Sequence, residues 1–392
     1  MNTPDIDLAA VAVRVKAARA VRGWNQTMLA EAADVSQPTV SRMESGNRPV
    51  TLVEADKLAT ALGVALDTLL YGSRVQERVL VALRIGEDAE RGAATSAGIE
   101  LLELDDRLDA VVDELRQTPL ELPPVPTEGT PVELGRQLAA RLRDQLGLAS
   151  APVSDPLQLI EELTGVDAGT RPLPEGVSGM CLCDPERSTS VVLANSEHPA
   201  ERQRFTLAHE LAHLLFQDGA HVDADADAAR GPKETRAHEF ARCFLAPQHG
   251  IVEWLQRARS GDTTSTVTEE HLGLLARYFG VSAKVIAIQL KGLQLYGSAE
   301  PLATPALASR YGWRREYDTS QQAARMPRPP LRLVRRAQAG YQAGRVGLPV
   351  LAMLTGRSES DVLAELNESG ISPRRYERKR LNLDALIARS IA

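Results

Sequence analysis

The chain has 392 residues, of which 43% are hydrophobic and 25% charged, and its formal net charge is −7. This length and composition predict two or three globular domains with ordinary apolar cores. No apolar run approaches membrane-spanning length, and the acidic N-terminus lacks the basic head and apolar core of a signal peptide. Three cysteines are too few for a disulfide framework or a four-cysteine metal cluster, which indicates a reducing compartment. Together these features lead us to expect a cytoplasmic protein that makes no membrane contact.

The first 73 residues predict a compact all-α domain. Val11, Val15, Ala18 and Val21 give the first helix an apolar stripe at helical spacing. Ser36 is a good N-cap for the third helix, and the proline that follows is tolerated in its first turn. The helices expected after the first cover residues 26–33, 37–44, 52–62 and 66–70.

Residues 29–46, which read LAEAADVSQPTVSRMESG, resemble the helix-turn-helix of XRE-type, phage-repressor-like DNA-binding domains. Residues 58–64 resemble that family's next helix. The resemblance implies a transcriptional regulator that binds double-stranded operator DNA, with a homodimer as one expected state. Because residues 8–70 are not basic, a helix-turn-helix reused for protein contacts is the alternative.

The third helix of such a domain presents its N-terminal residues to the major groove. Glutamine pairs with adenine and arginine with guanine or phosphate, while the family's glutamine at the start of the second helix contacts phosphate. The expected DNA-contacting residues are Gln26, Gln37, Thr39, Ser41 and Arg42. Pro38 departs from the polar residue usual there, which removes one base contact.

Residues 74–117 carry leucines at helical spacing and predict a helical connector, either a dimerisation arm or a clamp between domains. Residues 118–131 are rich in proline and predict a linker. We therefore expect a central domain over 132–300 and a helical C-terminal region over 301–392.

The central domain contains the run FTLAHELAHLLF at residues 205–216. His209 and His213 lie four residues apart, so on a helix both imidazoles project from one face and can bind one zinc ion. Glu210 lies beside that face as a candidate general base. Since the neighbours are apolar, three buried ionisable groups must coordinate a metal or form hydrogen bonds; a buried helix with two hydrogen-bonded histidines is the alternative.

A catalytic zinc ion needs a third protein ligand. Glu234 follows His213 by twenty-one residues, at the start of another helical run, and completes a gluzincin pattern. The competing candidates are His221, His238, His249 and Glu239. The spacing of Asp223, Asp225, Asp227 and Glu234 resembles a calcium loop, but the required glycine is absent, so we expect a solvated acidic loop that favours basic substrates.

Helices over 132–148 and 156–163, with strands over 177–182 and 189–194, predict a small sheet beside the zinc helix. The expected class is therefore α+β and mostly helical, with a zincin-like central domain. Cys181 and Cys183 share one strand face and are expected in the core.

Residues 204–213, Glu234-x-x-Ala237-x-x-Phe240-Ala241 and Leu245-Ala246-Pro247 together resemble the ImmA/IrrE family of bacterial metallopeptidases, over about residues 132–295. The resemblance implies a Zn²⁺-dependent endopeptidase in which Glu234 completes the zinc site and Glu210 acts as general base. It also implies a protein substrate, a helix-turn-helix repressor, in a stress or mobile-element response.

One position departs from that family, which commonly has asparagine where this chain has His238. His238 lies one helical turn after Glu234, so it either orients a zinc-binding histidine or competes as a ligand. His221, Tyr278 and Tyr311 are the candidates for stabilising the oxyanion. Two other functions remain open: a non-catalytic regulator that senses a metabolite or a metal, and an antitoxin-like binding module.

Residues 306–392 contain 16 Lys and Arg against 8 Asp and Glu, a local net charge of +8 that leaves −15 for the rest. Apolar patterns over 331–345 and 350–366 predict helices there. Because helices with apolar faces pack, we expect this basic region to dock on the acidic body rather than on nucleic acid.

Overall fold

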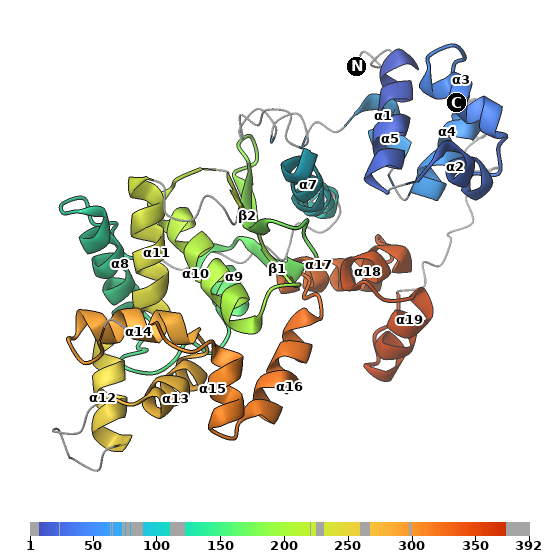
Figure 1. Cartoon of the computed structure of the whole chain (residues 1–392). Coiled ribbons are helices and arrows are strands. Elements are labelled where there is room, and N and C mark those ends of the chain that lie inside the picture. Colours follow the sequence, from blue (N-terminus) through green and yellow to red (C-terminus); the bar gives the residue numbers. More distant parts are fainter. Residues whose placement is uncertain are drawn as a thin grey trace, which may run out of the picture.

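The computed structural model confirms a mostly helical α+β protein (Figure 1). The residues that the structure describes are 8–22, 24–62, 64, 66–72, 75, 79, 89–109, 122–219, 221–224, 231–258, 267–297 and 300–373. Much of the predicted connector, two of the calcium-loop residues (Asp225 and Asp227) and the last nineteen residues, 374–392, lie outside them.

The N-terminal domain has the five predicted helices. They are α1 (Leu8–Val21), α2 (Gln26–Ala32), α3 (Gln37–Glu44), α4 (Leu52–Leu62) and α5 (Leu66–Tyr71). Ser36 caps α3 by accepting a hydrogen bond from the Thr39 amide, and Asn25 caps α2 in the same way, which satisfies amides that helix starts leave open. Val11, Leu29 and Leu58 belong to a core of this domain's own.

The centre of the molecule is a four-stranded sheet. Its strands are β1 (Asp167–Arg171), β2 (Val177–Asp184), β3 (Thr189–Asn195) and β4 (His221–Ala224), in the order β1-β3-β2-β4. β1 pairs parallel with β3, and the other pairs are antiparallel. The sequence predicts β2 and β3 but not β1 or β4, because a five-residue and a four-residue strand contain no long alternating or β-branched run.

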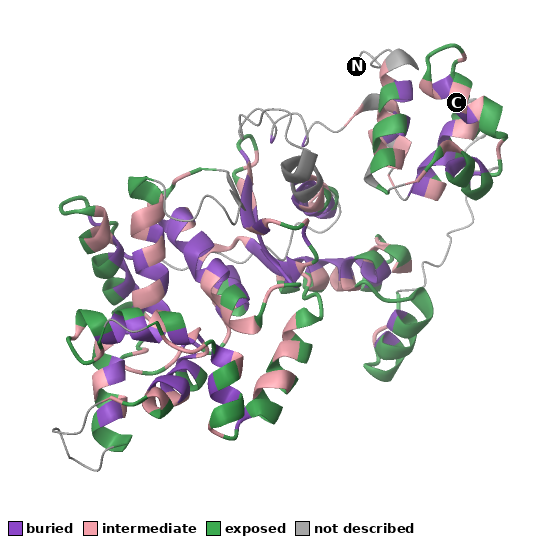
Figure 2. Ribbon diagram, in the orientation of Figure 1, coloured by how far each residue is buried: buried purple, intermediate pink, exposed green. Residues whose placement is uncertain are grey.

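One face of the sheet is covered by α10 (Ala200–Phe216), with α8, α9 and α11 around it (Figures 1 and 2). These last three helices are α8 (Pro131–Gln145), α9 (Pro156–Thr164) and α11 (Pro232–Leu245). Alternate strand residues such as Cys181 and Val192 join this core, as predicted for Cys181. Gly135 brings α8 against α11, since an added Cβ would lie 2.4 Å from the Arg236 carbonyl oxygen.

Further helices extend this core. They are α12 (Gln248–Ala258), α13 (Glu269–Phe279), α14 (Ala283–Gly292), α15 (Thr304–Arg310) and α16 (Arg314–Arg325). Within the described residues, no single helix is both long and apolar enough to cross a membrane. α13 and α14 are long and apolar enough only when taken together, and they are bent by 111° relative to each other.

The opposite face is covered by α7 (Ala89–Asp109) and α17 (Leu331–Gln342), followed by α18 (Leu348–Thr355) and α19 (Glu359–Glu368). Leu102 and Leu333 share a core there with Met180 and Leu193 of the sheet. At Gly98 of α7 an added Cβ would lie 2.4 Å from Leu182 Cδ1, so helix and strand touch. The described connector leucines therefore cover the sheet instead of forming an arm. The elements on either side of the expected boundaries near 131 and 300 share hydrophobic cores.

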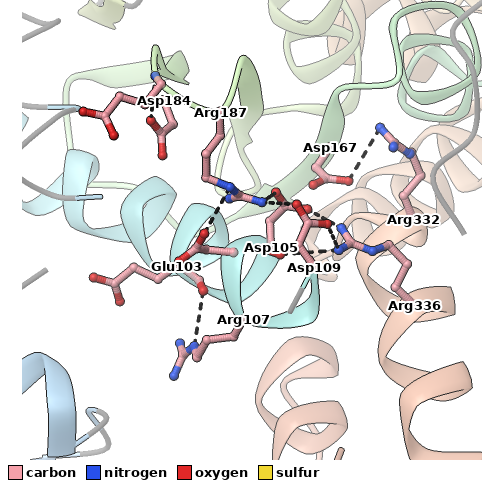
Figure 3. Close-up of polar contacts among 11 residues, drawn as sticks. Glu103, Asp105, Arg107, Asp109, Asp167, Asp184, Arg187, Arg332 and Arg336 are labelled. Atoms are coloured by element: carbon pink, nitrogen blue, oxygen red, sulfur yellow. Dashed lines mark hydrogen bonds and ion pairs between the residues drawn. The ribbon is translucent and has the colours of Figure 1, made fainter. Parts of the chain in front are cut away.

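Ion pairs hold α7 and α17 on this face (Figure 3). Arg336 of α17 pairs with Asp105 and Asp109 of α7, and Arg187, from the β2–β3 turn, pairs with the same two carboxylates. Arg328 likewise pairs with Asp155. The predicted docking of the basic C-terminal region on the acidic body is thus confirmed for its described part.

Candidate metal centre

α10 places the two histidines of the HExxH motif on one buried face. It runs from Ala200 to Phe216, and its residues from Thr206 to His213 are all buried. The exposed fractions are 3% for His209, 0% for Glu210 and 2% for His213. Ionisable groups are this deeply buried only where they bind a partner or a ligand, because the loss of hydration is costly.

Glu234, in the first turn of α11, meets both histidines. Its Oε2 lies 3.1 Å from His209 Nε2, its Oε1 lies 3.4 Å from His213 Nε2, and the two Nε2 atoms are 3.0 Å apart. Among the described residues these three side chains form the one group of ligating atoms that converge within 4.8 Å. Burial acts to raise the pKa of Glu234, but hydrogen bonds with the two histidines and their charges together outweigh burial and lower it.

This donor set fits a catalytic zinc ion. Two imidazole nitrogens and one carboxylate oxygen are the ligands of gluzincin-type sites, and they leave a fourth position for water or substrate. The set also excludes the harder cations as the natural occupant, since Mg²⁺ and Ca²⁺ take oxygen ligands almost exclusively.

Glu210 points from α10 towards β2. A Cβ added at Gly179 of β2 would lie 3.2 Å from Glu210 Oε1, 2.4 Å from Thr206 Cγ2 and 2.9 Å from the Leu193 carbonyl oxygen. Gly179 therefore makes room for the carboxylate beside the ligand pair. The sequence alone does not identify this residue, because a glycine inside a strand does not show which side chain will pack against it.

Asp218 is a second residue of this site that the sequence alone does not identify. Its Oδ2 lies 2.9 Å from His213 Nδ1, and its Oδ1 pairs with Arg236 and lies 3.5 Å from Lys233 Nζ. Burial acts to raise the pKa of Asp218, but the hydrogen bond with His213 and the charges of Arg236 and Lys233 outweigh it and lower the pKa. The pair Asp218-Gly219 predicts a turn after the helix. No local sequence pattern predicts that this turn brings the Asp218 side chain back to His213.

Two other candidates for the third ligand, Glu239 and His249, contact groups outside the ligand cluster. Glu239 is buried in ion pairs with Arg136 and Arg242, and His249 Nε2 lies 3.0 Å from the Ala149 carbonyl oxygen. His221 starts β4, but its side chain is outside the described part of the chain.

His238 lies beside the ligands without joining them. Its ring centroid is 4.5 Å from that of His209, and it stacks on Phe205 with centroids 5.7 Å apart. The predicted proximity of His238 to the site is therefore present, as ring packing against His209. Of the oxyanion candidates, Tyr278 is 39% exposed on α13 and Tyr311 packs near Gly273, and neither is placed at the ligand cluster by these contacts.

The expected DNA-contacting residues gather on α2 and α3. Gln37 Nε2 donates to Gln26 Oε1 at 3.0 Å, and Gln26 Nε2 donates to Glu44 Oε2 at 2.9 Å. Arg42 and Gln37 are exposed, Thr39 and Ser41 are partly so, and the Thr39 hydroxyl is hydrogen-bonded to Ser36. The fold thus brings the two glutamines together, although eleven positions separate them.

Known proteins resemble this chain in the same two regions. Residues 164–291 match the IrrE N-terminal-like domain family, and residues 15–69 match a helix-turn-helix family. The radiation response metalloprotease IrrE of Deinococcus radiodurans is 36% identical over 126 residues, which cover 30% of this chain and 37% of that protein. The protein of the same name from Deinococcus deserti is 31% identical over 179 residues, covering 44% of this chain and 57% of the relative.

The chain therefore spans about a third to somewhat over half of the length of these relatives. The IrrE-like segment extends from β1 to α14 and includes α10 and α11, the two helices that carry the ligand cluster. The chain thus combines an N-terminal region that matches a helix-turn-helix family with a central region that matches the IrrE N-terminal-like domain family and resembles the two IrrE metalloproteases.

Proposed function

We propose that this protein is a DNA-binding transcriptional regulator that also acts as a zinc-dependent endopeptidase on a repressor-type regulatory protein. The observation that carries the proposal is the convergence of His209, His213 and Glu234 beside the buried carboxylate of Glu210. The helix-turn-helix domain in the same chain supports the regulatory setting. The activity reported in the names of the two Deinococcus relatives supports the peptidase half.

In this proposal His209, His213 and Glu234 hold the zinc ion. When bound, zinc supplies a Lewis acid that polarises the scissile carbonyl and makes water more acidic. Glu210 accepts a proton from the attacking water and returns it to the leaving amine. Burial of Glu210 between α10 and Gly179 keeps that carboxylate in one place for both transfers.

The N-terminal domain supplies the DNA contact in this proposal. α3 enters the major groove with Gln37 and Arg42 directed at base edges or phosphate. The hydrogen bonds from Gln37 to Gln26 and from Gln26 to Glu44 orient both glutamine side chains before DNA is bound. Such preorganisation lowers the entropy cost of binding.

The test uses the full chain, its metal content and candidate substrates, namely helix-turn-helix repressors encoded near its gene. We expect about one zinc ion per chain and sequence-specific cleavage, measured by gel electrophoresis and mass spectrometry of the products. Glu210→Gln should keep the zinc ion and slow cleavage by about 10²–10⁴-fold, the usual contribution of a general base. Glu253→Gln is the matched control, because Glu253 lies on α12 and pairs with Arg257 at the surface.

A Glu210→Gln protein that cleaves as fast as the parent contradicts the proposed mechanism. A parent that binds zinc, cleaves none of the repressors and changes its operator affinity with zinc supports the metal-sensing regulator instead. Copurification of a stoichiometric toxin partner supports the antitoxin-like module.

A further inference from the structure

We propose that Asp218 is a positioning residue that fixes the imidazole of His213 for zinc and sets the spacing of the two helices that carry the ligands. This inference rests on the proposed zinc site and concerns a residue outside the HExxH motif and the Glu234 turn.

His213 is held at both ring nitrogens. Its Nε2 faces the other ligands, 3.0 Å from His209 Nε2 and 3.4 Å from Glu234 Oε1, while its Nδ1 lies 2.9 Å from Asp218 Oδ2. The side chains of His213 and Asp218 are 2% and 3% exposed, so water does not compete for this contact. A carboxylate at Nδ1 accepts the Nδ1 proton and leaves the Nε2 lone pair free for a metal, which also makes the nitrogen a better donor.

Asp218 reaches His213 because the chain reverses directly after α10. Gln217 adopts the left-handed conformation, with φ 57° and ψ 44°, and the Asp218 amide donates to the His213 carbonyl at 3.0 Å. This turn ends the helix and folds the next side chain back against the last ligand. The contact between Asp218 and His213 is therefore a consequence of the helix ending at Phe216 and of the left-handed turn that follows it.

The second oxygen of Asp218 connects α10 to α11. Oδ1 pairs with Arg236, which lies on α11 two residues after Glu234, and the Arg236 guanidinium packs over the Phe216 ring at 4.3 Å from its centroid. Lys233 Nζ adds a longer contact at 3.5 Å from a mostly exposed side chain. Asp218 thus contacts the last ligand of one helix and the helix turn that carries the third ligand.

This arrangement predicts a specific loss when Asp218 is replaced. Removing an acidic partner of a zinc-binding histidine typically weakens metal affinity by about 10- to 100-fold. We expect Asp218→Ala to weaken Zn²⁺ binding within that range, because His213 loses its Nδ1 acceptor and α10 loses its tie to α11. Asp218→Asn should weaken binding less, since the amide oxygen still accepts the Nδ1 proton. Arg236→Gln, which keeps the acceptor and removes the tie, should have the smallest effect.

The experiment is Zn²⁺ titration against a competing chelator, with thermal unfolding of the zinc-free proteins as the readout for folding. Asp155→Asn is the matched control, because Asp155 also pairs with an arginine, Arg328, and accepts a backbone hydrogen bond, from Leu157. That control should bind Zn²⁺ like the parent. A long-range ¹H–¹⁵N spectrum of the zinc-free parent should show His213 with its proton on Nδ1, a readout that needs no variant.

If Asp218→Ala and Asp218→Asn bind zinc as tightly as the parent, and only their melting temperature without zinc is lowered, the inference is overturned. A His213 proton on Nε2 in the parent overturns it too, even when the alanine variant does not fold. A parent without zinc affinity overturns both this inference and the proposed function. If zinc binding is weakened in the variants but the parent shows no proteolysis, the result supports the positioning role of Asp218 and contradicts the proposed peptidase activity.

Discussion

The two faces of the central sheet carry two different kinds of buried charged cluster. On the α10 face, His209, His213 and Glu234 turn nitrogen and oxygen atoms towards one another. On the α7 face, the carboxylates of Asp105 and Asp109 each meet a guanidinium. The first set brings together donor atoms that fit a metal cation, whereas the second already contains its cations, the guanidinium groups of Arg187 and Arg336. Buried charge is thus evidence for a binding site only where acceptors converge on one another.

The α7 face is the more sensitive of the two to loss of a single charge. Arg336 is 2% exposed and faces two carboxylates (Figure 3). We expect Arg336→Met to lower the free energy of unfolding by about 3–5 kcal/mol, because it leaves buried carboxylates without their counter-ion. Urea unfolding measures the effect, and Zn²⁺ affinity of the folded protein should stay unchanged.

Arg357→Met is the control for that variant, because Arg357 pairs with Glu365 at the surface. Exposed ion pairs contribute about 0–1 kcal/mol. Equal losses in the two variants, or weakened zinc binding in Arg336→Met, would remove the distinction between the two faces.

A single methyl group tests the packing on the α10 face. Gly179→Ala should cost about 1–3 kcal/mol of stability, since its Cβ would collide with Thr206 and crowd the Glu210 carboxylate. Proteolytic activity should fall more than Zn²⁺ affinity does, because the displaced group is the proposed general base and not one of the proposed ligands. Gly297→Ala serves as control, since open space surrounds Gly297; a Gly179→Ala protein with parental activity contradicts this account of Glu210.

A buried acid on the α7 face, Asp167, should make stability depend on pH. Burial, together with the negative charges of Asp105 and Glu161, raises the pKa of Asp167 to about 8, and the nearby Arg332, at 4.0 Å, and Arg336 oppose this rise only partly. The folded state therefore keeps a proton that the unfolded chain releases near pH 3.8. The free energy of unfolding should fall as pH rises between about 4 and 8, by up to about 1.4 kcal/mol per pH unit from this group.

Asp167→Asn removes that slope, and urea unfolding from pH 4 to pH 8 measures it. Burial likewise raises the pKa of Glu161 to about 7, so a smaller slope below pH 7 should persist in the variant. Asp318→Asn, at an exposed pair with Arg314, should leave the pH profile unchanged. A parent whose stability rises from pH 4 to pH 8 in step with the variant would show that Asp167 is ionised in the fold.

The smallest effect is expected at His238. Its ring packs on His209 and Phe205, and such ring contacts contribute about 0.5–1.5 kcal/mol. His238→Asn should therefore weaken Zn²⁺ binding less than about tenfold, measured by the same chelator competition, with His249→Asn as control. A larger loss would make His238 a ligand, the role that its position one turn after Glu234 left open.

Helical periodicity explains why parts of the candidate metal centre and of the helix-turn-helix region could be predicted from the sequence. His209 and His213 share a face because four residues make about one turn, and Ser36 caps α3 through a neighbour three residues away. Glu234 could be proposed because it follows His213 at a recognisable spacing and lies in the first turn of a recognisable helix. These are local properties, so the residues that carry them can be read in order along the chain.

Tertiary structure decided what joins distant positions. Arg336 meets Asp105 across 231 positions, α7 covers the sheet, and β1 and β4 form only by pairing with β3 and β2. Asp218 and Gly179 become parts of the metal centre through a left-handed turn and a close helix–strand approach. The sequence by itself determined the candidate metal-binding residues and the helices that carry them, because helix geometry is local. The groups that contact those residues depend on packing between segments, which no local pattern encodes.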